Sequence, residues 1–233
     1  KAWINIQHWN ECRKPIDLAV LRGKTAYGGF DLSTKWDLTC FGLLFPPQPG
    51  VSDFVFLAKY YCPEDGIKFR ANRDKVPYPD WEREGWLKAT PGNVIDYEYI
   101  RADILEEGAK YDIPVVYYDP FTATETAIKL TEAGVNCLEM RQNGHYFTEP
   151  ILKLEEIIGK HTLNKGIDPV LDWMFENVAI KQYPDSKVMF DKKESREKID
   201  GMVVLAMCMG GYLRSLAPDE EKSVYLERDF LFM

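Results

Sequence analysis

Short apolar runs separated by polar segments divide this chain into two regions of different texture. In the first region, the runs at 27–32, 38–45 and 52–61 have the composition of strands and are joined by loops of a few residues. This spacing predicts an antiparallel meander. The polar segment that follows, 63–93, contains Pro77, Pro79 and Pro91 and is expected to be an insertion.

The second region alternates between helical spacing and short apolar runs. Helices are expected at 94–110, 122–133, 148–158, 170–177 and 195–213, and strands at 115–119, 135–140, 178–182 and 188–190. A meander followed by β-α-β-α units predicts an α/β domain with a mixed central sheet flanked by helices. We expect this domain at 26–215, a helical lead-in or linker at 1–25, and an acidic tail at 216–233.

Composition excludes several classes of protein. The longest apolar run, Met202 to Met209, has eight residues, whereas a membrane span needs about 20, so no membrane partner is expected. The five cysteines include no CxxC pair, and no two of the three histidines are three or four residues apart. A thiolate or histidine zinc site is therefore not expected, and a reducing compartment fits the cysteines best.

Two further features bear on phosphate chemistry. Gly23, Lys24 and Thr25 look like the end of a phosphate-binding loop, but the first glycine of that motif would stand at Leu18. No ATPase activity is therefore expected from this chain. The net charge is −8, from 29 basic and 37 acidic residues, and this balance by itself argues against a nucleic-acid partner.

Three aspartates lie in unusually apolar surroundings. Asp31 and Asp119 each end a predicted strand, and Asp200 lies near the start of the last predicted helix. An ionised carboxylate against a core is costly unless it is paired, hydrogen-bonded or bound to a metal. If the two strands are parallel neighbours, both acids reach the sheet edge where open α/β sheets place ligands. An all-carboxylate set suits Mg²⁺ or Mn²⁺.

Each acid also has an ordinary structural interpretation. Asp31 fits a turn, Asp119 fits a helix N-cap, and Asp200 fits the first turn of a helix, where the macrodipole favours an acid. Asp37, six residues after Asp31, is either a further acid of the same site or a residue that initiates a strand. The combination of two strand ends and a helix start favours the metal-site hypothesis, in which two divalent ions promote phosphoryl displacement.

The segments that hold these acids resemble, in the same order, the nuclease domain of terminase large subunits from tailed bacteriophages. The resemblance covers about residues 25–213. The matching pieces are GFDLST (29–34) with DLT (37–39), GNVIDY (92–97), YDPF (118–121), RQNG (141–144), PVLDWM (169–174) with Asn177, and KIDG (198–201).

This resemblance implies a ribonuclease H-like fold and a metal-dependent endonuclease that cuts concatemeric viral DNA by a two-metal-ion mechanism. Asp31, Asp119 and Asp200 match the catalytic, metal-binding acids, and Asp37 matches a further acid near the site. The cofactors implied are two Mg²⁺ or Mn²⁺ ions. Two alternatives remain: another ribonuclease H-like strand cutter, such as a resolvase or transposase-like enzyme, and a non-catalytic docking module for a portal or motor.

The resemblance also implies partners, which are double-stranded DNA, an ATPase motor domain outside this chain, the small terminase subunit and the portal. The location that it implies is the host cell cytoplasm. The candidate DNA contacts are Lys198, Lys192, Lys193 and Arg196. Part of the negative charge would belong to the metal site, so the charge of −8 predicts weak, salt-sensitive DNA binding by the isolated domain, not its absence.

Overall fold

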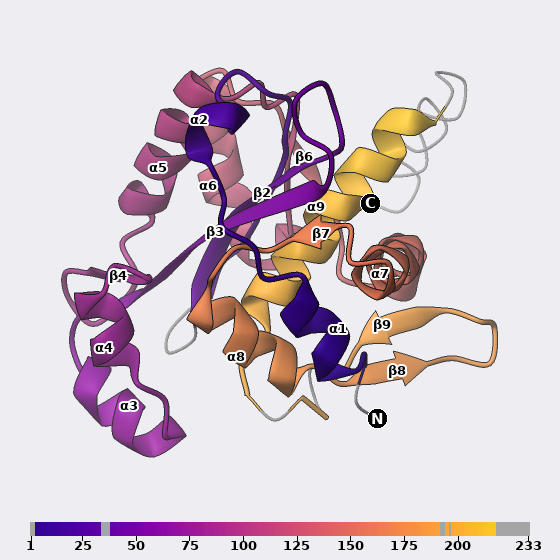
Figure 1. The fold of residues 1–233 in the computed structure, drawn as a ribbon. Helices are drawn as coiled ribbons and strands as arrows, with labels where there is room; N and C mark the ends of the chain where they lie inside the picture. Colours follow the sequence, from indigo (N-terminus) through magenta and orange to yellow (C-terminus); the bar gives the residue numbers. More distant parts are fainter. Residues whose placement is uncertain (1–2, 34–37, 192–193, 196, 218–233) are drawn as a thin grey trace.

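The computed structural model describes residues 3–33, 38–191, 194–195 and 197–217 (Figure 1). Its centre is a seven-stranded sheet in the order β4-β3-β2-β1-β5-β6, with β7 paired to β3. The strands are β1 (Tyr27–Asp31), β2 (Thr39–Phe45), β3 (Phe54–Pro63), β4 (Leu87–Thr90), β5 (Val116–Tyr118), β6 (Cys137–Glu139) and β7 (Leu163–Asn164). Strands β1 to β3 form the expected antiparallel meander, and β5 and β6 continue the sheet in parallel with β1.

The segment 63–93 is more regular than its polar composition indicates. It forms α3 (Ile67–Asp74), α4 (Tyr78–Arg83) and β4, which pairs in parallel with β3. The insertion therefore contains two helices and a strand that its composition did not indicate. The four-residue strand β4 has buried residues only at its two ends, and such a short run carries little periodic signal.

Helices cover both faces of the sheet (Figure 1). One face packs against α5 (Tyr97–Lys110) and α6 (Pro120–Glu132), and the other against α9 (Asp200–Leu216), with α7 (Gly144–Gly159) and α8 (Pro169–Asn177) beside it. Every residue from Gly201 to Gly211 is buried, so α9 is the central helix of its layer. Gly42 allows its close approach, because a Cβ there would lie 2.8 Å from Val204 Cγ1.

Two helices begin four or five residues away from their expected starts. Helix α7 begins at Gly144, not at 148, because the Asn143 side chain caps it by accepting from the backbone N–H of His145 and Tyr146. Thr148 instead lies inside the helix and donates to the carbonyl of Gly144. Helix α9 begins at Asp200, not at 195.

The remaining elements lie on different faces of the sheet. Helix α1 (Ile6–Glu11) and a separate hairpin of β8 (Ile180–Gln182) and β9 (Val188–Phe190) pack at one end of the α9 layer, whereas α2 (Leu18–Leu21) buries Leu21 in the core on the α5 and α6 face. Trp9 of α1 is completely buried and stacks on Phe175 of α8, with ring centroids 4.2 Å apart. The lead-in segment thus contributes a large aromatic side chain to the core. In the part of the chain that is described, no helix is long and apolar enough to cross a bilayer.

Candidate active site

The register of the sheet brings Asp31 and Asp119 together. In the parallel β1–β5 pair, Phe30 lies opposite Tyr118, and each of these residues is followed by one of the two aspartates. Asp31 ends β1 and is 6% exposed. The condition under which the two acids reach one sheet edge, that their strands are parallel neighbours, is therefore met, and this is the edge where α/β proteins bind ligands.

Asp119 also performs the capping role that its sequence position allows. Its Oδ1 accepts from the backbone N–H of Phe121 at 3.0 Å, which caps α6. This hydrogen bond orients the carboxylate at the end of β5. Capping and ligand binding are compatible, because a carboxylate has two oxygens that can accept or coordinate.

The first turn of α9 lies at the same edge of the sheet. A Cβ added to Gly201 would lie 3.0 Å from Tyr60 Cε1, and Tyr60 is level with the carboxyl end of β1 in the register. Ten residues further along α9, a Cβ on Gly211 would lie 3.5 Å from Tyr27 Cβ, at the start of β1. The helix therefore runs antiparallel to β1 and places Asp200, its first residue, beside the carboxyl ends of the strands.

The pKa of the Cys40 thiol is affected by the same acids. Cys40 is fully buried on β2, directly opposite Asp31. Burial raises the pKa of its thiol well above the usual value, and the charges of Asp200, Asp168, Cys208 and Asp31 raise it further. Cys40 therefore stays protonated, so the donors at this edge are carboxylate oxygens and not a soft thiolate.

Asp168 lies two residues before the predicted helix 170–177, where its sequence position fits a helix cap. Its place beside this site was not predicted. It caps α8 as expected, with Oδ1 accepting from Leu171 N–H at 2.9 Å, and its Oδ2 accepts from the Tyr60 hydroxyl, also at 2.9 Å. Burial raises its pKa to about 6. Tyr60 and Asp168 are 108 positions apart, and no local pattern indicates that they meet.

The described residues do not form a complete metal cage. No group of three His, Cys, Asp or Glu side chains within the described ranges is arranged to hold a metal ion. Of the other candidates, Lys198 is half-buried two residues before Asp200, whereas Asp37, Lys192, Lys193 and Arg196 lie outside the described residues. The donor chemistry fits a hard divalent cation, and Asp31, Asp119 and Asp200 are the described residues that could hold one.

The meander, the parallel β1–β5–β6 unit and the helices on both faces form a ribonuclease H-like nuclease domain, the architecture of the solved structures compared below. Residues 1–215 match the family model of the terminase large subunit, endonuclease domain. The chain belongs to this family.

Two curated proteins are similar to most of this chain. The terminase large subunit of Enterobacteria phage HK97 is 29% identical over 188 residues, which are 79% of this chain and 36% of the relative. Protein YmfN of Escherichia coli K12 is 27% identical over 218 residues, 90% of this chain and 48% of the relative. The chain thus spans less than half the length of either protein.

Two solved structures show the fold. The crystal structure of the HK97 large terminase matches with a TM-score of 0.81 and 26% identity, covering 90% of this chain and 43% of that one. The nuclease domain of the large terminase subunit of bacterial virus Sf6 matches with a TM-score of 0.54 and 9% identity, covering 90% and 98%. The Sf6 comparison supports the architecture alone.

Proposed function

We propose that this domain is a metal-dependent DNA endonuclease that cuts concatemeric viral DNA during genome packaging, by a two-metal-ion mechanism. The observation that carries the proposal is the meeting of three elements at one sheet edge: the ends of β1 and β5, with Asp31 and Asp119, and the start of α9, with Asp200. Membership of the terminase nuclease family supports the reaction class. The Sf6 relative was solved with manganese, which supports a divalent ion as cofactor.

Each acid has a distinct role in this proposal. Asp31, on the strand between β2 and β5, would bind both of two Mg²⁺ or Mn²⁺ ions, Asp119 and Asp200 would bind one ion each, and Asp37 would be a further acid. When bound, two such ions lower the pKa of a water and offset the charge on the leaving oxygen. The protein contributes orientation: the cap bond to Phe121 fixes Asp119, and the packing of α9 fixes Asp200.

The DNA and the packaging partners are also part of the proposal. In this proposal Lys198, two residues before Asp200 in sequence, holds a phosphate, and Lys192, Lys193 and Arg196 extend this basic stretch. With a net charge of −8, the domain by itself holds double-stranded DNA weakly and depends on the ATPase motor domain to keep its substrate close. The small terminase subunit and the portal complete the assembly in the host cytoplasm.

Plasmid cleavage in parallel Mn²⁺, Mg²⁺, Ca²⁺ and EDTA reactions tests the function. We expect cleavage with Mn²⁺ or Mg²⁺ that EDTA abolishes. Asp31→Asn, Asp119→Asn and Asp200→Asn should each abolish it while the circular dichroism spectrum is retained, and Asp53→Asn, a surface control, should not. Cleavage that survives the three active-site substitutions would overturn the assignment. Faster cutting of branched than of linear duplex would favour the resolvase-like alternative.

A further inference from the structure

We infer that Tyr60 and Asp168 are positioning residues that fix the first turn of α9 and thereby set the place of Asp200. The inference rests on the proposed function, in which Asp200 is a metal-binding acid. Tyr60 and Asp168 are buried beside the site, and neither is one of the three acids proposed to bind the metal ions.

The pair is buried and firmly anchored. Tyr60 is 2% exposed and Asp168 is 9% exposed, and the Tyr60 hydroxyl donates to Asp168 Oδ2 at 2.9 Å. The other carboxylate oxygen accepts from Leu171 N–H at 2.9 Å, which ties the acid to the first turn of α8. The plane of the Tyr60 ring is therefore set at both ends, by strand β3 and by the N-terminus of α8.

The first turn of α9 rests directly against this ring. A Cβ on Gly201 would lie 3.0 Å from each of three atoms: Tyr60 Cε1, Leu171 Cδ1 and Met174 Sδ. The backbone N–H of Gly201 also donates to Met174 Sδ at 3.0 Å. Because the turn is enclosed by the Tyr60 ring on one side and α8 on the other, a rotation of the ring displaces the residue next to Asp200.

Capping of α8 alone does not account for the two hydrogen bonds of this side chain. A serine would cap the helix without burying a charge, but its single hydroxyl would not hold Tyr60 as well. The buried carboxylate also acts on Cys40 together with Asp200 and Asp31, so Asp168 adds a like charge to a neighbourhood that already holds two. What the carboxylate adds beyond the cap is the second acceptor oxygen that holds Tyr60.

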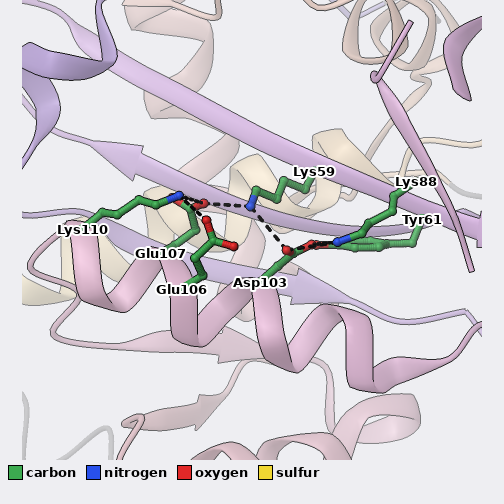
Figure 2. Close-up of polar contacts among 7 residues, drawn as sticks. All are labelled: Lys59, Tyr61, Lys88, Asp103, Glu106, Glu107 and Lys110. Carbon is green, nitrogen blue, oxygen red and sulfur yellow. Dashed lines mark hydrogen bonds and ion pairs between the residues drawn. The ribbon is translucent and has the colours of Figure 1, made fainter. Parts of the chain in front are cut away.

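The chain offers a matched control one residue away. Tyr61 points to the opposite face of the sheet, where its hydroxyl donates to Asp103 Oδ2 at 2.7 Å (Figure 2). Asp103 lies on α5 and also pairs with Lys59 and Lys88. Tyr60→Phe and Tyr61→Phe therefore each remove one buried hydroxyl from a carboxylate that keeps another partner. Of the two tyrosines, only Tyr60 lies against α9.

The first measurement is backbone amide exchange, which does not depend on activity. We expect Tyr60→Phe to speed exchange in the first turn of α9, and Tyr61→Phe to leave that turn unchanged. Unchanged exchange at α9 in Tyr60→Phe would overturn the inference. If exchange changes as expected while the wild type cuts no DNA, the proposed function fails and the positioning of the turn stands.

The second measurement is the response to Mn²⁺ alone, read as the rise in melting temperature and as the Mn²⁺ concentration for half-maximal cleavage. A displaced ligand costs about tenfold or more, so Tyr60→Phe and Asp168→Ala should raise the half-maximal concentration by that factor and reduce the thermal shift. Asp168→Asn keeps the cap and can donate to the Tyr60 oxygen, so it should stay within about twofold of the wild type. An Asp168→Ala or Tyr60→Phe variant that responds to Mn²⁺ like Tyr61→Phe would contradict the inference.

Discussion

The ammonium group of Lys165 is paired with the carboxylate of Asp172 inside the domain, where the Lys165 side chain has no solvent exposure. The same carboxylate accepts from Trp9 Nε1 at 2.8 Å and pairs with Arg13. Lys165 Nζ also lies 5.0 Å from the centre of the Trp9 ring. One acid on α8 therefore connects the lead-in segment, the segment between β7 and α8, and the core.

Removing this acid should be costly. Asp172→Ala leaves the buried Lys165 ammonium without its carboxylate, and breaking such a pair from one side costs about 3–5 kcal/mol. Urea denaturation at neutral pH measures the loss. Asp53→Ala is the control, because its partner Lys14 is 41% exposed and exposed pairs contribute about 1 kcal/mol or less. Equal losses in the two variants would show that burial does not govern the Lys165 pair.

The unfolding free energy should depend on pH through Asp168. Its pKa is raised from 3.8 to about 6 by burial, so the folded state holds this proton more tightly than the unfolded state. The contribution of Asp168 to the unfolding free energy is therefore largest below pH 4. It is lost as the pH rises to 6, which lowers the unfolding free energy by about 3 kcal/mol at most.

Asp168→Asn isolates that contribution, since it cannot titrate. We expect its stability relative to the wild type to increase between pH 4 and 6 and then to level off, measured by denaturant titration at several pH values. A difference that stays constant over this range would show that the Asp168 pKa is not raised by folding.

Two glycines should respond in opposite directions to alanine. A Cβ at Gly42 would lie 2.7 Å from Phe56 Cε2 in the packed layer under α9, whereas a Cβ at Gly108, inside α5, would meet no heavy atom within 4 Å. Gly42→Ala should therefore lower the unfolding free energy by about 1–3 kcal/mol. Gly108→Ala should raise it by about 0.5–1 kcal/mol. Thermal unfolding of both variants checks the two signs, and a stabilised Gly42→Ala would contradict the packing of α9 on β2.

The lead-in segment should contribute to stability. Trp9→Ala empties a site that is completely buried and stacked on Phe175, and truncations of this size cost about 3–5 kcal/mol. Leu18→Ala is the comparison within the same segment, because Leu18 is 57% exposed. If Trp9→Ala unfolds at the same urea concentration as Leu18→Ala, the first helix is not part of the folded core.

The core strands were predictable because their burial is complete and local. Strands β1 and β2 are buried at every position, and apart from Asp31 and Thr39 they consist of apolar residues and glycine, so the sequence indicates them whatever their partners are. Helix starts were less predictable, because they depend on which of several polar residues captures the first N–H groups. At α7 this residue is Asn143 and not Thr148.

The candidate site could be predicted only as well as the order of the strands in the sheet could be predicted. Acids at the ends of two apolar runs meet only if the strands are parallel neighbours, and β1 and β5 are. Asp168 could not be found in this way. Its importance comes from Tyr60, which lies on the distant strand β3, and long-range contacts of this kind leave no pattern in a single sequence.

Only very short strands border the sheet at its two edges. The four-residue β4 and the two-residue β7 lie along β3 on one side, and the three-residue β6 lies on the other. Edge strands expose backbone groups that can recruit a strand from another chain, which is a common route to aggregation. Edges this short offer few such groups. Association of this domain with other proteins should therefore depend on side-chain surfaces and not on the addition of a strand to its sheet.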